Sequence, residues 1–144
     1  MNKSNLILMV VVISAAGFFA GAWAWSNNRT TPTSSALESK TSADGWVEIE
    51  ITPLALGSKE WSFSIILNAH QEIDVDLMKA ATLADNRGNA LTPLRWEEEE
   101  LTPGGHHREG ALVFSAPVPK PQNITLALKD VGGAAVRTFS WRLP

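Results

Sequence analysis

The stretch that decides the fold of this 144-residue chain is Trp61-Ser62-Phe63-Ser64-Ile65-Ile66-Leu67. Trp61, Phe63, Ile65 and Leu67 recur at every second position, and successive side chains of a strand point to opposite faces of a sheet. One face of this segment is therefore wholly apolar, while the other includes two serines. The alternation predicts a β-strand that lies against a hydrophobic core.

The same alternation recurs on both sides of this strand. It is present in Val47–Ile51, Leu91–Trp96, Leu112–Phe114, Ile124–Leu128 and Phe139–Leu143, with turn-forming residues at Asp85–Asn89 and Val131–Ala134. Short strands at this spacing predict an all-β fold, an immunoglobulin-like antiparallel β-sandwich over residues 46–144. We expect Asp76–Leu83 to form a strand with a short helical approach.

An apolar segment precedes the predicted domain. Leu6–Trp25 has no formal charge, and as a helix its 20 residues would cover about 30 Å, the thickness of a bilayer core. It is either a transmembrane anchor, residues 1–25, or a signal peptide cleaved after Ala22-Trp23-Ala24. A signal-peptide core has about 7 to 15 apolar residues, and Trp23 and Trp25 suit a membrane interface, so we favour the anchor.

The flanking charges predict how this anchor is oriented. Lys3 places the N-terminus in the cytoplasm and the rest outside, although Arg29 on the other flank weakens the asymmetry. Residues 26–45 are rich in Ser, Thr and Asn, so we expect a disordered tether there. The predicted protein is a single-pass protein of the cell membrane whose C-terminal domain is periplasmic or extracellular.

Composition excludes several functional classes. Twelve Lys and Arg against 15 Asp and Glu give a net charge of -3, which lacks the basic stripe that nucleic-acid binding requires. The absence of cysteine excludes disulfides, thiolate zinc sites and a cysteine nucleophile. No serine lies in a nucleophile-elbow sequence, and no glycine-rich phosphate loop precedes a helix. We therefore expect a protein that is not an enzyme.

A glycine-rich segment, Gly104–Gly110, contains two adjacent histidines, His106 and His107; the only other histidine is His70. Neutral imidazole is a common ligand of zinc and copper, and a carboxylate can complete the ligand set. Adjacent strand residues face opposite ways, so both histidines can bind one ion only on an irregular backbone, which glycine permits. The alternative is that one histidine packs or forms hydrogen bonds within the domain while the other is solvated.

Charged residues near the histidines also have two interpretations. Asp74, Asp76 and Asp85 are either ligands of a hard cation or, as is more usual in turns, acceptors that cap backbone amides. Arg108 and Glu109 either orient the histidines or pair with each other on the surface. The acidic run from Glu97 to Glu100 is either a solvated loop or an attractor of cations.

The tryptophans of the predicted domain divide into two pairs. Trp61 and Trp141 fall on the apolar side of their strands, so we expect them in the core. Trp46 lies on the same side as Glu48, and Trp96 leads into the acidic run, so these two rings are the candidates for exposure. An exposed ring would favour binding of carbohydrate or peptide.

Several motifs together resemble a known group of proteins. They are Asn68–His70, Asp74–Leu77, Gly104–Gly110 and Arg137–Trp141, in the order His…Asp-x-Asp…Gly-Gly-His-His-Arg-x-Gly. This order resembles a family of small prokaryotic membrane-anchored or exported domains, over most of Trp46–Pro144. The resemblance implies an extracytoplasmic β-sandwich and one site shared by His70, Asp76, His106 and His107, but no activity. Copper-binding periplasmic sandwich domains are less similar, since this chain lacks their methionine-rich stretches and N-terminal histidine.

The sequence thus predicts a membrane-anchored binding domain. Its expected ligand is a divalent metal ion, copper or zinc, held by His70, His106 and His107 with Asp76 or Asp74 nearby. The alternative is a structural or interaction subunit that docks on a membrane protein through the same histidine segment.

Overall fold

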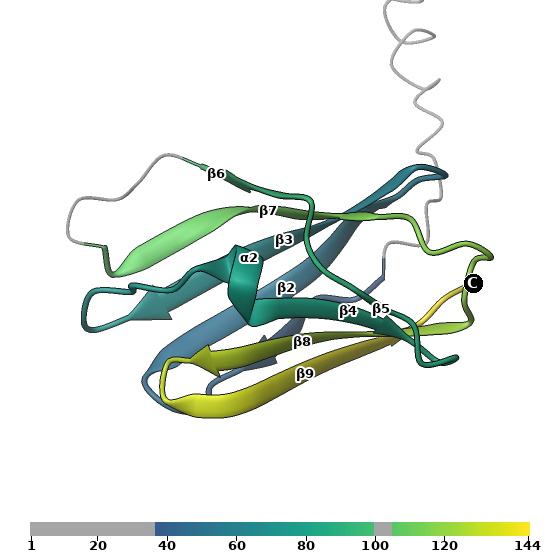
Figure 1. Ribbon diagram of the computed structural model, residues 1–144. Helices are drawn as coiled ribbons and strands as arrows, with labels where there is room; N and C mark the ends of the chain where they lie inside the picture. Colours follow the sequence, from purple (N-terminus) through teal and green to yellow (C-terminus); the bar gives the residue numbers. More distant parts are fainter. Residues whose placement is uncertain (1–36, 100–104) are drawn as a thin grey trace, which may run out of the picture. The chain divides into compact units, whose positions relative to one another are not determined.

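The computed structural model describes residues 37–99 and 105–144. They form two antiparallel sheets of five and four strands (Figure 1), the arrangement expected of the predicted β-sandwich. The predicted anchor, Leu6–Trp25, lies outside the described residues. Within the two described ranges, no helix is long and apolar enough to cross a bilayer.

The five-stranded sheet, called sheet A below, contains the strand from which the fold was predicted. Its strand order is β1-β2-β3-β7-β6. The bounds are β1 (Lys40–Ser42), β2 (Val47–Leu56), β3 (Glu60–Ala69), β6 (Arg95–Glu98) and β7 (His107–Ser115). β3 is the central strand and pairs along its whole length with β7.

The four-stranded sheet, sheet B, has the order β5-β4-β8-β9. Its strands are β4 (Ala81–Asp85), β5 (Ala90–Leu91), β8 (Asn123–Val131) and β9 (Ala134–Arg142). The one-turn helix α2 (Leu77–Ala80) leads directly into β4. This confirms the prediction of a short helical approach followed by a strand.

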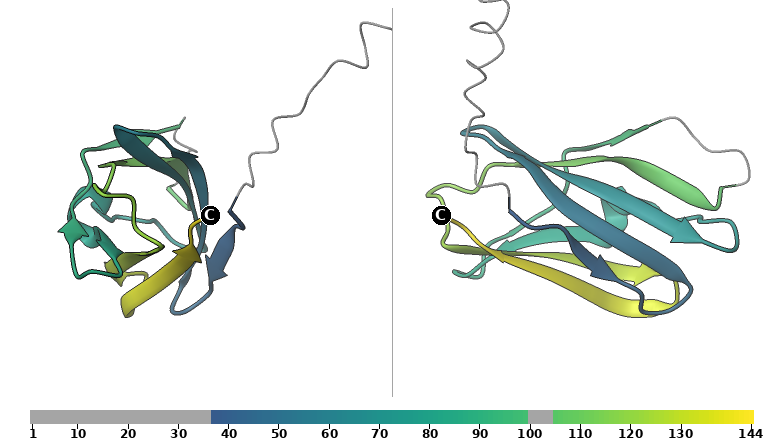
Figure 2. Two further views of the ribbon diagram at one scale, coloured as in Figure 1. Left: turned by 90° about the vertical axis from the view of Figure 1, so that its right-hand side faces the viewer. Right: turned by 180° about the vertical axis from the view of Figure 1, so that it is seen from behind.

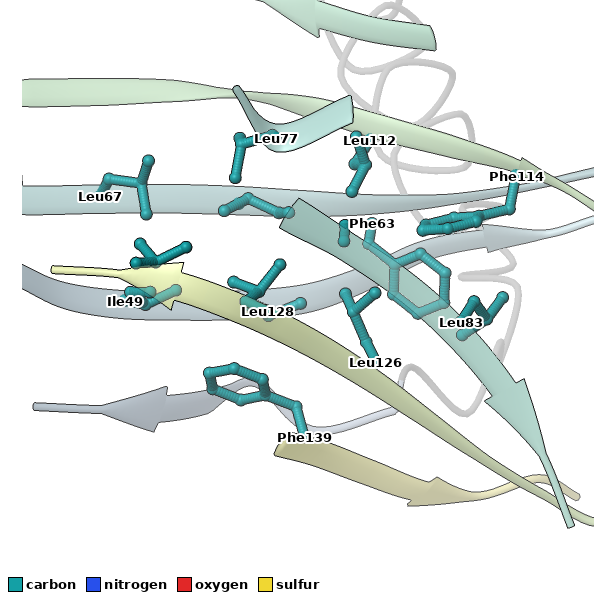
Figure 3. Packing of buried hydrophobic residues seen from close by; sticks show 14 of the residues in the cluster. Ile49, Phe63, Leu67, Leu77, Leu83, Leu112, Phe114, Leu126, Leu128 and Phe139 are labelled. Atoms are coloured by element: carbon teal, nitrogen blue, oxygen red, sulfur yellow. The ribbon is translucent and has the colours of Figure 1, made fainter. Parts of the chain in front are cut away.

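The core lies between the two sheets (Figure 3). The alternating residues of β3, Trp61, Phe63, Ile65 and Leu67, are all buried, as predicted. Phe63 meets Phe114 of β7 edge to face, with 5.8 Å between ring centroids. Burial of each such side chain contributes about 1.5 to 3 kcal/mol, so these faces supply most of what holds the sheets together.

The prediction of one strand over Leu91–Trp96 was wrong. β5 ends at Leu91 in sheet B, and β6 begins at Arg95 in sheet A, so the chain crosses between the sheets (Figure 1). Pro93 lies in the crossing and is buried. Proline has no backbone N–H to donate to a ladder, which ends the strand.

The predicted tether also needs correction for residues 37–45. Lys40–Ser42 forms β1, which pairs with β2 at the edge of sheet A (Figure 2). The Trp141 indole nitrogen donates to the Glu38 carbonyl oxygen at 2.8 Å, and Leu37 packs against the core. A hydroxyl-rich composition indicated disorder, but backbone pairing and these two contacts order the segment.

A buried arginine joins two turns where β2 begins; we call it the arginine clasp. Arg137, only 2% exposed, donates from Nη1 to the carbonyl oxygens of Val47 (2.7 Å) and Ser42 (3.2 Å). Its Nη2 donates to those of Val131 (3.1 Å) and Asp44. Burial lowers the pKa of the Arg137 guanidinium, and the Asp44 carboxylate opposes this effect. The clasp fixes the β1–β2 turn against the predicted β8–β9 turn.

Candidate functional site at the histidine end of sheet A

The pairing of β3 with β7 gathers the histidines at one end of sheet A, which we call the histidine end. Asn68 lies opposite His107, and the Ala69 amide donates to the His106 carbonyl oxygen at 2.9 Å. His70 follows directly after β3. Segments far apart in the sequence therefore meet here, as a three-histidine site requires.

The side chains at this end alternate between the two faces of sheet A. Arg108 lies opposite the buried Leu67, so it is on the core side, and His107 is on the outer face with Asn68 and Glu109. His70 and His106 are exposed, while His107 is half-buried. Gly105, which precedes the histidines, has a φ of 64°, the irregular backbone that the sequence analysis expected there.

His107 is held between an amide and a carboxylate. Its Nδ1 lies 2.6 Å from Asn68 Oδ1, and its Nε2 lies 3.5 Å from Glu109 Oε2. In the neutral tautomer that donates from Nδ1 to Asn68, the lone pair is on Nε2. The same contact orients the ring in the way that partners of metal-binding histidines do. His107 thus has both the hydrogen bond of the packing alternative and a nitrogen able to bind an ion.

Asp76 is occupied by local contacts. Its Oδ1 accepts from the Met78 amide at 3.1 Å as the N-cap of α2, and its Oδ2 lies 2.9 Å from Lys79 Nζ. The hydrogen bond from Lys79 lowers the pKa of Asp76. Asp85 similarly accepts from the amides of Arg87 and Asn89. Both aspartates have the capping role that the sequence left open, and Asp76 would have to give up these contacts to bind an ion.

The predicted ligands do not converge on one point. In residues 37–99 and 105–144, no three histidine, cysteine, aspartate or glutamate side chains are placed so that they could hold a metal ion. A zinc–nitrogen bond is only about 2.0 to 2.1 Å long, so ligands must meet closely. His70, Asp76, His106 and His107 are therefore not a preassembled set, and a metal site here stays a hypothesis.

Of the two residues expected to support the histidines, only Glu109 contacts one. Arg108 instead donates from Nε to Glu98 Oε1 at 2.6 Å and from Nη1 to the Val75 carbonyl oxygen at 2.8 Å. The hydrogen bond from Arg108 lowers the pKa of Glu98, a member of the acidic run. Arg108 thus joins the edge strand β6 to the segment before α2.

The tryptophans follow the prediction except at one position. Trp61 and Trp141 are buried, and Trp46 is 43% exposed. Trp96 is half-buried, and its ring lies so close to Gly110 that a Cβ added there would come within 2.8 Å of it. Its indole nitrogen is buried, and within residues 37–99 and 105–144 no side chain comes within strict hydrogen-bond geometry of it, although Glu98 lies near enough for Trp96 to help lower the pKa of that carboxyl. Among the four tryptophans of the described ranges, Trp46 alone is available as an exposed platform.

A hollow of about 440 Å³ lies beside Trp46, and sequence reasoning missed it. It is formed by the β1–β2 turn, the start of β2 and the end of β3, and is lined by Ala43, Gly45, Trp46, Glu48, Asn68, Ala69, His70 and Gln71. The outward alternation of Trp46 and Glu48 was the available signal, but their proximity to His70 depends on the pairing of β2 with β3.

Comparisons of this chain with protein-family models, with curated proteins and with solved structures find no match.

Proposed function

We propose that this chain is a membrane-anchored, extracytoplasmic binding domain with an immunoglobulin-like architecture and no catalytic role. Leu6–Trp25 is its proposed anchor, and the histidine end of sheet A is its proposed binding surface. The domain belongs, in this proposal, to the prokaryotic family that its His…Asp-x-Asp…Gly-Gly-His-His-Arg-x-Gly order resembles.

One observation carries this proposal: side chains suited to ligand contact gather on the histidine end, where three paired strands begin or end. Trp46 directly precedes β2, His70 directly follows β3, and His107 is the first residue of β7. Trp46 and His70 are exposed, and His107 is half-buried. The pairing of these strands fixes the points from which the three residues emerge, which suits a site of recognition.

Within residues 37–99 and 105–144, the contacts of His107 include no protein hydroxyl or thiol that it could activate as a nucleophile. Its ring nitrogens face Asn68 Oδ1 and Glu109 Oε2. An imidazole that activates a nucleophile faces a hydroxyl or thiol and removes its proton. An amide oxygen and a carboxylate have no such proton to give.

Single cysteines test the proposal, because the natural chain has none. Ala43→Cys reports on the histidine end, because Ala43 is exposed and lines the hollow beside Trp46 without a proposed ligand contact. Ala127→Cys and Thr138→Cys are controls on the outer face of sheet B. We expect a membrane-impermeant maleimide to label all three in intact cells. Labelling at the histidine end should be slower than in the purified protein, because bound ligand covers it. If labelling slowed in cells, relative to the purified protein, by the same factor at the histidine end and on sheet B, the histidine end would not be a binding surface. Failure to label any position in cells would contradict an extracytoplasmic domain.

A divalent ion, copper or zinc, is the candidate ligand of this surface. The hydrogen bond between Ala69 and His106, which brings the three histidines to one strand end, favours it. His70, His106 and His107 are the proposed ligands, and their side chains would have to move from their present positions to meet at one ion. A membrane protein that docks on the same surface is the alternative occupant.

Calorimetric titration of the full chain in detergent with Cu²⁺ and Zn²⁺ tests the ion. We expect binding that is lost in the double variant His106→Ala, His107→Ala and weakened in His70→Ala. Asp76→Asn is the matched control, since it removes a carboxylate from the predicted set but keeps a capping oxygen. Absence of binding to the natural chain, or equal binding by the double variant, would exclude the ion and leave the docking alternative.

A further inference from the structure

We propose that the hollow beside Trp46 is a saccharide-binding site, in which a sugar ring stacks on the indole and the neighbouring side chains bind its hydroxyls. This inference rests on the proposed function, because it names the ligand class of the histidine end. It differs from the ion hypothesis in its chemistry and in the residues that it uses.

The platform is exposed and held in place. The Trp46 amide donates to the Gly132 carbonyl oxygen at 2.8 Å. A Cβ added to Gly133 would lie 3.2 Å from Trp46 Cδ1, so the edge of the indole rests on the β8–β9 turn. Arg137 fixes that turn and the β1–β2 turn together through carbonyl oxygens of both. A ring held before binding loses little conformational entropy when a ligand stacks on it.

The polar lining has the groups that sugar hydroxyls need. Glu48 supplies acceptor oxygens, and Gln71 supplies both a donor and an acceptor. The Oδ1 atom of Asn68 is used by His107, which leaves the amide nitrogen of Asn68 as a donor toward the hollow. His70 adds an imidazole. A sugar ring presents an apolar C–H face and closely spaced hydroxyls at its rim, so an indole beside mixed donors and acceptors matches it.

The size of the hollow suits a small molecule, and its composition favours a saccharide over other occupants. About 440 Å³ falls within the range of small-molecule sites, roughly 300 to 1,000 Å³. A cation would suit Trp46 and Glu48 but would leave the neutral groups Asn68 and Gln71 without matching partners. A metal ion would find one imidazole and one carboxylate among the lining residues. A neutral sugar matches the whole lining.

The experiment uses the full chain in lauryldimethylamine oxide micelles, a detergent without a sugar head group. Chitotetraose, cellotetraose and maltotetraose are the probes. Their binding is measured by calorimetry and by the chemical shift of the Trp46 indole N–H resonance. We expect at least one probe to shift that resonance. Trp46→Ala should weaken its binding about tenfold or more, and Trp46→Phe should retain part of the affinity. Leu54→Ala is the matched control, because Leu54 is 59% exposed near the other end of β2.

Three results would overturn the proposal of a saccharide site. The first is a Trp46 resonance that no probe shifts, and the second is equal saccharide affinity in the natural chain and in Trp46→Ala. The third is a Trp46 resonance that tetramethylammonium chloride shifts and no oligosaccharide shifts. Protection of the Ala43→Cys variant in the native membrane separates this outcome from failure of the proposed function. A protected surface with no saccharide binding overturns the saccharide alone, whereas an unprotected surface overturns the broader proposal.

Discussion

Two arginines occupy inward-facing positions at the same end of the domain, yet their surroundings differ. Arg137 of β9 lies opposite the buried Leu128 and is itself 2% exposed. Arg108 of β7 lies opposite the buried Leu67, and its side chain is 14% exposed. Arg137 donates to four backbone carbonyl oxygens, whereas Arg108 donates to the Glu98 carboxylate and to one carbonyl oxygen.

The difference separates a structural region from an adaptable one. Carbonyl oxygens cannot leave the backbone, so the arginine clasp determines the path of two turns. A carboxylate side chain on an edge strand can rotate away, so the Arg108 contact holds β6 and the segment before α2 less firmly. The proposed binding surface lies between these two regions, with its aromatic platform on the rigid side and His107 on the other.

Loss of the clasp should have the largest effect on stability. Arg137→Met keeps much of the apolar volume but leaves four carbonyl oxygens without this donor. We expect the free energy of unfolding to fall by about 3 to 5 kcal/mol, as measured by urea denaturation. Arg137→Lys is the control, and it should recover only part, because an ammonium cannot span four separated acceptors. A loss below about 1 kcal/mol would show that the clasp is not essential to these turns.

The next largest effect should come from the backbone contact beside the clasp. Gly45 has a φ of 75°, and a Cβ added there would lie 2.0 Å from the Gly132 carbonyl oxygen. Gly88 has a φ of 88° with no atom within 4 Å of the added Cβ. We expect Gly88→Ala to cost about 1 to 2 kcal/mol from backbone conformation alone, and Gly45→Ala about 1 to 3 kcal/mol more from the clash. Equal losses by thermal unfolding would mean that the two turns are not packed together.

Local patterns predicted those parts of the fold that depend on neighbouring residues. The alternation of β3 gave its buried face correctly, and Asp85–Asn89 and Val131–Ala134 are the turns that their glycines indicated. The crossing at Pro93 and strand β1 were missed. Both depend on partners distant in the sequence, as with the Glu38 carbonyl oxygen that accepts from Trp141. Composition alone cannot reveal such a partner.

The candidate site divides in the same way. Local patterns did not place His106 and His107 near His70, because that proximity follows from the pairing of β3 with β7; only the resemblance to a family grouped the three. The capping role of Asp76 was readable as an alternative, since aspartate before a helical turn commonly accepts from its amides. The hollow beside Trp46 was not, because three segments of the chain build it.

Acid should reduce the contribution of the Arg108–Glu98 pair to the free energy of unfolding, and Glu98→Gln should remove this pH dependence. Arg108 lowers the pKa of Glu98 in the folded state, so this pair stabilises the fold above the unfolded pKa of about 4.3 and loses that contribution as pH falls through the lower, folded pKa. We expect Glu98→Gln to cost about 1 kcal/mol at pH 7 and less as pH falls below about 4. Glu99→Gln, the same charge change on the next exposed residue, is the control. A pH-independent difference between natural and Glu98→Gln proteins would contradict the pairing.

The smallest effect should come from the helix that Arg108 adjoins. Asp76→Ala removes the acceptor for the Met78 amide and the partner of Lys79, whereas Asp76→Asn keeps the acceptor. Because α2 has only one turn and Asp76 is exposed, we expect Asp76→Ala to lower the unfolding midpoint less than Glu98→Gln does, and Asp76→Asn less again. Amide hydrogen exchange at Met78 is the local measurement, and it should accelerate in the alanine variant alone. If both variants left exchange at Met78 unchanged but abolished binding of Cu²⁺ or Zn²⁺, Asp76 would be a ligand rather than a cap, and the Arg108 region would belong to the binding surface.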